Sequence, residues 1–176
     1  IAIPFQHVHP FGAPETPTPD SYWMFNFSRV QWQHSIAENG YERKKDQGKI
    51  LPEDNWVWSP IGLINMHFPE RWGYIQFVED AKQAALPSYH RIKQLGWNIH
   101  YLQKIHHQKH AQFATDIEDL SGYAEYITPL LEGFLLSYTN ISGGAADGAG
   151  YTLLIRDANR PATFYIDHLG NQKYDE

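Results

Sequence analysis

The hydrophobic positions in the first half of the chain follow the alternation that is typical of β-strands. Residues 23–32 alternate between apolar and polar side chains, with one skip after Phe27 that predicts a bulge or a change of face. Residues 37–54 are polar and contain Asn39-Gly40, a turn signal that indicates a hairpin or a long loop. Aromatic residues gather again over 55–77. The pattern therefore predicts an all-β first part.

The pattern changes to a helical period in the second half. Apolar residues recur there at intervals of three and four, at Ile92, Leu95, Ile99 and Leu102, and this spacing predicts one long helix over residues 88–113. The run from Thr115 to Glu118 has the form of a capping box and predicts a short second helix through Leu120. We expect strands over residues 133–142, 151–156 and 162–167, with the glycine-rich run 143–150 as a hairpin loop.

These elements predict two parts, residues 1–80 and residues 81–176. The expected fold class is mainly β: an antiparallel β-sandwich that is incomplete at its N-terminus, followed by a small α+β region with one long helix. Residues 1–5 are apolar and lack the basic start of a signal peptide. Their pattern is typical of the later part of a β-strand. We therefore expect the chain to be a processed or truncated piece of a longer protein.

Composition narrows the classes of function. Aromatic residues make up 15% and charged residues 19% of the 176-residue chain, a balance that fits β-rich proteins and proteins that bind by stacking. The net charge of -6 argues against a nucleic-acid partner, and the one basic run, Arg43–Lys45, is flanked by acidic residues. No stretch approaches the roughly 20 apolar residues of a membrane span. The absence of cysteine excludes disulfides and thiolate metal sites.

The aromatic block carries a family likeness. Its sequence is Asn55-Trp-Val-Trp-Ser-Pro-Ile-Gly62, followed by Ile64-Asn-Met-His-Phe-Pro-Glu-Arg-Trp-Gly-Tyr-Ile-Gln-Phe77. It resembles the C-terminal strands of family 9-like carbohydrate-binding modules, in particular the versions found in Bacteroidetes surface proteins. Residues 1–5 and 25–30 are similar to earlier strands of that module, so the likeness covers about residues 1–80.

The resemblance implies an antiparallel β-sandwich, often calcium-bound, that grips an oligo- or polysaccharide between two tryptophans. Trp58 looks like the later stacking tryptophan and Asn55 like its polar companion, while Trp56 shares a face with Trp58 if both lie in one strand. The other stacking tryptophan and the usual calcium ligands belong to a part of the module that the chain does not contain. The resemblance also implies an exported protein, located in the periplasm, on the cell surface or outside the cell.

Other interpretations of the same residues remain open. Trp56 and Trp58 are also compatible with a packed sandwich core. Separately, the missing first strands leave open sheet edges, which favour a structural or assembly protein that pairs with a missing N-terminal segment or with another chain. The sequence His106-His-x-x-His110 has zinc-binding spacing on a helix, but it lacks the glutamate of a metalloprotease and an evident third ligand. We expect a protein that is not an enzyme.

Overall fold

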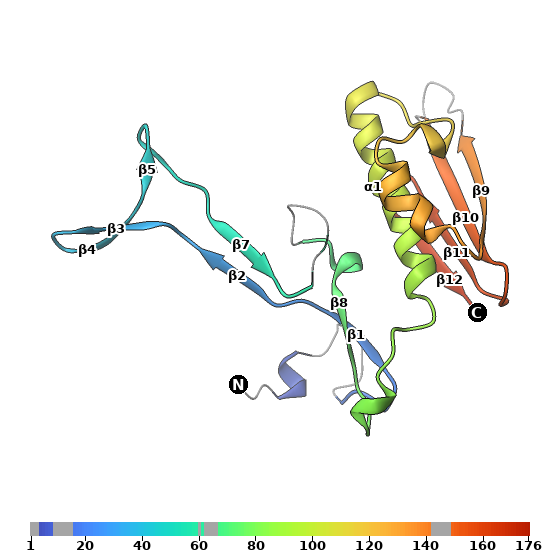
Figure 1. Cartoon of the computed structure of the whole chain (residues 1–176), viewed down its shortest axis with the longest axis horizontal. Helices are drawn as coiled ribbons and strands as arrows, with labels where there is room; N and C mark the ends of the chain where they lie inside the picture. The colour runs from blue at the N-terminus through green and yellow to red at the C-terminus, as the bar shows by residue number, and fades with distance from the viewer. Residues whose placement is uncertain (1–3, 9–15, 60, 62–66, 142–148) are drawn as a thin grey trace. The chain divides into compact units, whose positions relative to one another are not determined.

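The computed structural model describes residues 4–8, 16–59, 61, 67–141 and 149–176 (Figure 1). The chain divides into two compact units, residues 1–85 and 86–176. The boundary predicted after residue 80 lies close to this division. All paired strands are antiparallel and one long helix is present, which confirms the prediction of a mainly β chain with one long helix.

The strands of the first unit pair in twos. They are β1 (Tyr22–Phe25), β2 (Ser28–Gln31), β3 (His34–Ala37), β4 (Gly40–Arg43), β5 (Lys45–Asp46), β6 (Lys49–Ile50), β7 (Asp54–Val57) and β8 (Gly73–Gln76). Strand β1 pairs with β8, β2 with β7, β3 with β4 and β5 with β6. Short 3₁₀ turns lie at Phe5–His7, Pro69–Arg71 and Ala81–Gln83.

This arrangement differs in detail from the expected sandwich. Among the described residues of the first unit, no sheet has more than two strands, so two facing sheets are not formed there. Isolated two-stranded ribbons bury little apolar surface and are marginal by themselves. Ile61 is the one apolar side chain that is buried in the described part of this unit. The described part of the first unit therefore shows strands and turns without a packed core.

Local sequence explains the two hairpins of the first unit. Strands β3 and β4 form a hairpin at the predicted turn signal, but its two connecting residues are Glu38 and Asn39, and Gly40, with a φ of 133°, is the first residue of β4 and pairs with Ala37. Strands β5 and β6 are joined by Gln47 and Gly48, whose φ angles are 47° and 81°. Two consecutive positive φ angles are the signature of the type I′ turn, whose twist matches that of the strands it connects.

The skip in the alternation after Phe27 also has a structural counterpart. Strand β1 ends at Phe25 and β2 begins at Ser28, with Asn26 between them. The Asn26 side chain takes the place of a backbone pair: its Nδ2 donates to the Ser59 carbonyl at 3.0 Å and its Oδ1 accepts from the Ser59 amide at 3.0 Å. The predicted bulge or change of face therefore coincides with an interruption between β1 and β2, where one amide side chain bonds to the Ser59 backbone.

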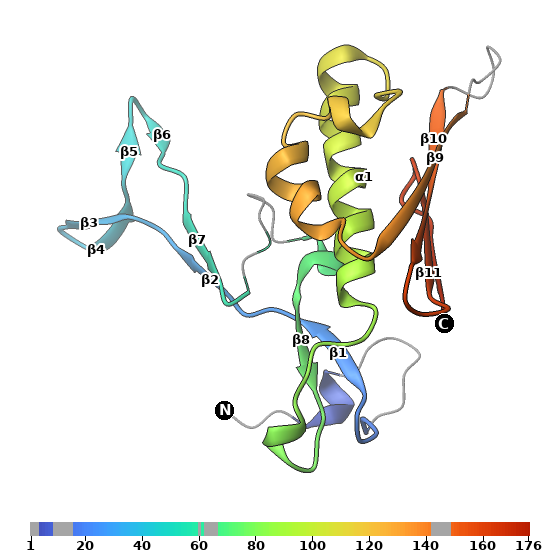
Figure 2. The ribbon, with the colours of Figure 1, turned by 45° about the vertical axis from the view of Figure 1, so that its right-hand side comes forward.

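The second unit is a helix packed on an antiparallel sheet (Figures 1 and 2). Its elements are α1 (His90–His110), short helical turns at Ile117–Asp119, Tyr123–Ile127 and Thr128–Leu130, and strands β9 (Phe134–Ile141), β10 (Gly150–Asp157), β11 (Thr163–Asp167) and β12 (Gln172–Asp175). The strand order is β12-β11-β10-β9. Helix α1 and the strands β9, β10 and β11 were predicted, whereas β12 was missed.

The predicted apolar stripe of the helix forms the core of this unit. Ile92, Leu95, Ile99 and Leu102 are buried against apolar side chains of the sheet, chiefly Leu153, Ile155, Phe164 and Ile166. Gly96 lies on the same stripe, and a Cβ atom there would collide with the Phe164 ring. Glycine therefore allows the helix to approach the sheet closely at this point.

The predicted capping box is wrong in its cap residue. The turn that follows α1 is a single 3₁₀ turn at Ile117–Asp119, and its N-cap is Asp116, whose side chain accepts from the Glu118 amide at 3.0 Å. Aspartate is at least as good an N-cap as threonine. Its side chain readily accepts from the amide two residues further on, and this pattern suits a tight turn. Thr115 instead accepts, through its carbonyl, a hydrogen bond from Asn140.

Candidate functional site

The register of β2 and β7 decides which side chains share a face. Arg29 lies opposite Trp56 and Gln31 opposite Asp54. Because side chains alternate along a strand and directly paired residues point to the same side, these four residues lie on one face of the ribbon. The Arg29 guanidinium lies 5.6 Å from the centre of the Trp56 ring, which supports that assignment.

Trp58 continues the same face beyond the end of β7. Its backbone amide donates to the Phe27 carbonyl at 2.8 Å, which extends the pairing by one residue. The Phe27 and Trp58 rings meet edge to face at 6.1 Å. The Trp58 ring also lies over Gly73, where an added Cβ would come within 2.9 Å of Trp58 Cζ3. We call Phe27, Arg29, Gln31, Trp56 and Trp58 the tryptophan stripe.

Both tryptophans of the tryptophan stripe are half exposed. The exposed fraction is 51% for Trp56 and 56% for Trp58, so neither is a core residue among the described residues. Residues that are two apart along an extended strand are separated by about 6–7 Å, so the indoles of Trp56 and Trp58 lie side by side. Arg29 donates one hydrogen bond, to Gln31 Oε1 at 2.9 Å. A guanidinium carries five donors, so Arg29 can hold Gln31 and still bind a ligand.

The structure brings together two of the three predicted site residues. Trp56 and Trp58 share a face, whereas Asn55 lies opposite Val30 on the other face of the ribbon. Asn55 therefore lies on the face opposite Trp56 and Trp58, and the polar side chains on the tryptophan face are Arg29, Gln31 and Asp54. Arg29 and Gln31 were missed because two further hairpins lie between residues 28–31 and 54–57, and the Asn39-Gly40 turn signal indicates only the first of them.

The histidine-rich end of α1 brings two imidazole rings together, without a third metal-binding side chain among the described residues. The His106 and His110 rings lie 4.4 Å apart, but the His107 ring packs on Phe113 at 4.5 Å. Local desolvation and the neighbouring His110 lower the pKa of His106. Within the described ranges, no group of three or more histidine, cysteine or acidic side chains is placed to hold a metal ion. The calcium expected from the resemblance stays a prediction.

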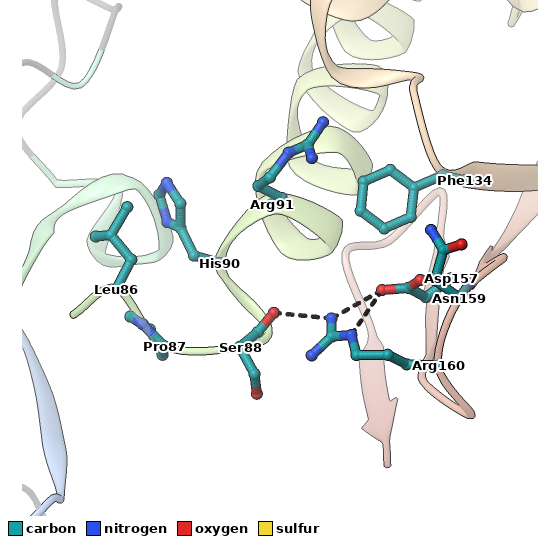
Figure 3. A pocket seen from close by; sticks show the side chains of 9 residues that line it. All are labelled: Leu86, Pro87, Ser88, His90, Arg91, Phe134, Asp157, Asn159 and Arg160. Atoms are coloured by element: carbon teal, nitrogen blue, oxygen red, sulfur yellow. Dashed lines mark hydrogen bonds and ion pairs between the residues drawn. The ribbon is translucent and has the colours of Figure 1, made fainter.

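The second unit has a surface cavity of about 380 Å³ at the start of α1 (Figure 3). Arg160 lies across it and is held by Asp157 Oδ2 at 2.8 Å and by the Ser88 carbonyl at 3.1 Å. On the opposite wall, the Arg91 guanidinium lies 5.5 Å from the centre of the Phe134 ring.

The polar groups of this cavity are largely engaged with one another. Hydrogen bonds from the Asn159 amide and from Arg160 lower the pKa of Asp157. Arg160 also approaches the Glu176 carboxylate at 3.5 Å. These bonds join the turn after β10, the start of α1 and the end of β12. The cavity is therefore a structural junction of the second unit, and the tryptophan stripe is the better candidate for ligand binding.

No helix in the described part of the chain is long and apolar enough to cross a membrane. No family model, curated protein or solved structure matches the chain.

Proposed function

We propose that the chain is a non-catalytic carbohydrate-binding protein or module of an exported protein, and that the sugar stacks on Trp56 and Trp58. The observation that supports the proposal is that two half-exposed indoles lie on one face of the β2–β7 ribbon with a guanidinium and an amide beside them. The resemblance of residues 55–77 to family 9-like carbohydrate-binding modules is the second support for the proposal.

The chemistry of the tryptophan stripe suits a saccharide. The C–H face of a pyranose is weakly positive and packs on the negative π face of an indole. Hydroxyl groups at the ring edge then require donors and acceptors in nearly the same plane. Arg29 supplies donors and Gln31 supplies both, and their mutual hydrogen bond of 2.9 Å keeps them together beside Trp56. Two neighbouring indoles favour a chain of at least two sugar units over a monosaccharide.

The binding test uses calorimetry with a panel of neutral gluco-, xylo- and manno-oligosaccharides and their uronic-acid-containing counterparts. We expect Trp58→Ala and Trp56→Ala each to weaken binding by about tenfold or more, since loss of an aromatic stacking partner costs roughly 1–2 kcal/mol. Tyr41→Ala is the matched control, because Tyr41 is an 80% exposed aromatic residue on β4 of the same unit. Equal loss in the control, or no loss in either tryptophan variant, refutes the proposed surface.

A second candidate function is a structural or assembly role, in which another polypeptide covers the first unit. The observation that favours it is the set of exposed apolar side chains on the ribbons, namely Phe27, Val30, Ile36, Tyr41, Ile50, Trp56 and Trp58, in a unit whose described part buries only Ile61 among its apolar residues. Calorimetry separates the two roles, because an assembly protein gives no heat with any oligosaccharide of the panel.

A further inference from the structure

The two edges of the four-stranded sheet in the second unit differ in a way that indicates a partner for one of them. Edge strand β12 is short and carries Lys173 and Asp175, which form an ion pair at 2.8 Å. Charged side chains and short length are the usual protection of an edge strand against pairing. The opposite edge, β9, has the sequence Phe-Leu-Leu-Ser-Tyr-Thr-Asn-Ile and contains no charge, proline or glycine.

Strand β9 pairs on one side only. It is hydrogen-bonded to β10 from Phe134 to Ile141, and Figure 1 shows it as the outermost strand of the sheet. In the described part of the chain, the one backbone hydrogen bond of β9 outside this ladder is that of the Phe134 amide with Leu131. Eight residues of uncharged strand are therefore left with an open edge.

The outward face of β9 carries two exposed apolar side chains near its ends. Leu135 is 61% exposed and Ile141 is 44% exposed. Neither lies opposite an apolar side chain on β10, since Leu135 pairs with Arg156 and Ile141 pairs with Gly150. Ser137 and Thr139 lie between them on the same face, because side chains alternate along the strand.

We infer that β9 pairs with β9 of a second copy of this chain, antiparallel about a two-fold axis at Tyr138, so that two four-stranded sheets join into one. In this register Leu135 of each copy lies directly opposite Ile141 of the other, and Ser137 lies opposite Thr139. The pairing thus covers both exposed apolar residues of both copies. It also gives hydrogen-bond partners to the backbone N–H and C=O groups along the open edge of β9. A two-fold axis one residue earlier, at Ser137, would instead place Leu135 opposite Thr139.

The uncharged sequence of β9 suits pairing with a second copy of itself better than pairing with a charged strand of another protein. The strand carries no charge, so self-pairing brings no like charges together although the whole chain has a net charge of -6. Isologous contacts of this kind are the commonest form of oligomer. Pairing through one strand buries less than the roughly 1,200–2,000 Å² of a standard interface, so we expect a dimer that dissociates in the micromolar range.

The first experiment measures the mass of the full chain in solution across the micromolar range by sedimentation velocity. We expect a concentration-dependent shift from monomer to dimer. Ser137→Lys should abolish it, because lysine on an edge strand opposes pairing and the two new charges lie on neighbouring positions across the axis. The matched control is Thr163→Lys, which places the same charge on the same sheet face, but on β11.

Two outcomes overturn the inference. One is a wild-type chain that stays monomeric over the whole range. The other is a dimer whose dissociation constant is the same in Ser137→Lys and in Thr163→Lys, because such a dimer uses another surface. Circular dichroism of each variant verifies that the fold is retained, as expected for substitution of the exposed Ser137.

The second experiment tests the register by disulfide trapping. The chain contains no cysteine, so every disulfide must involve the introduced cysteines. The double variant Leu135→Cys/Ile141→Cys should form a covalent dimer under mild oxidation, whereas Ser137→Cys should not. Positions 135 and 141 are about 20 Å apart along one strand, far beyond the roughly 7 Å limit between Cα atoms of a disulfide, so any bridge joins two chains. Efficient bridging by Ser137→Cys and none by the double variant would overturn the proposed axis.

Discussion

His100 makes the stability of the second unit dependent on pH. It lies on α1, is 2% exposed, and its Nδ1 is 2.7 Å from the Tyr151 hydroxyl and 3.2 Å from the Asp167 carbonyl. The Tyr151 side chain is itself fully buried. A neutral imidazole fits this environment, whereas an imidazolium would lose its hydration without gaining a carboxylate partner.

The pKa of His100 is correspondingly low. Burial, followed by the positive charge of Lys104, lowers it from 6.5 to about 4, although the Asp167 carbonyl and carboxylate act in the opposite direction. Since the pKa is depressed in the folded state, the unfolded chain takes up the proton first as the pH falls. The stabilisation is therefore complete above about pH 6.5 and is lost progressively toward about pH 4.

The size of the effect follows from the two pKa values. The full shift corresponds to about 3 kcal/mol, and the part lost between about pH 8 and about pH 5 is about 2 kcal/mol. We expect urea unfolding, followed by the circular dichroism of the helix, to show this loss in the wild-type chain. In His100→Gln the same loss should be almost absent, because the variant has no group that titrates at this position.

A control variant separates His100 from the other histidines. His110→Gln removes an exposed histidine from the last turn of the same helix and should leave the pH dependence as in the wild type. The reasoning is refuted if His100→Gln keeps the full wild-type slope between about pH 8 and about pH 5. It is also refuted if the wild-type chain is equally stable at both values, since a buried neutral histidine must lose stability on acidification.

Two further predictions concern the core of the second unit. Gly96→Ala should destabilise it by about 1–3 kcal/mol through overpacking against Phe164, and Phe164→Leu in the Gly96→Ala background should recover part of the loss in urea unfolding. An unchanged midpoint in Gly96→Ala would contradict the close approach. Gln103→Leu should cost about 1–3 kcal/mol, because the Ala114 amide, which donates to Gln103 Oε1 at 2.9 Å, loses its buried partner, whereas the Ala114 carbonyl keeps its hydrogen bond from the Tyr138 hydroxyl at 2.7 Å. A loss no greater than that of Lys104→Leu, its exposed neighbour on the helix, would contradict it.

The second unit could be predicted closely because its own residues decide its structure. The stripe from Ile92 to Leu102 finds its apolar partners on nearby strands of the same unit, so periodicity alone located the helix. Strand β12 was missed because, of the two residues of Gln172–Asp175 that face inward, Gln172 is polar and only Tyr174 is apolar, which is too little for an alternating pattern to be visible. The cap at Asp116 was missed because Thr115 and Asp116 are both good cap residues, and only the turn type distinguishes them.

The first unit was predicted less well for a physical reason that also bears on its function. Its strands were located by alternation, but alternation cannot say which of two faces is covered, and here the tryptophan face is open. Asn55 was predicted as the polar companion of Trp58, although alternation along the strand already places it on the opposite face. The position of Arg29 beside Trp56 depends on a strand pairing that no local signal encodes.

The ribbon exposes Trp56, Trp58 and Phe27, and full burial of each such side chain would contribute roughly 1.5–3 kcal/mol. The isolated ribbon is therefore less stable than the same ribbon with a ligand or partner over these side chains. Whatever covers the tryptophan stripe therefore stabilises the first unit by linkage. A saccharide covers the two indole faces and leaves Ile36 and Tyr41 in water, whereas a protein strand along the ribbon would cover those residues as well. Protection of β3 and β4 against hydrogen exchange, in addition to β2 and β7, would thus identify the occupant as a polypeptide, and protection confined to β2 and β7 would identify it as a sugar.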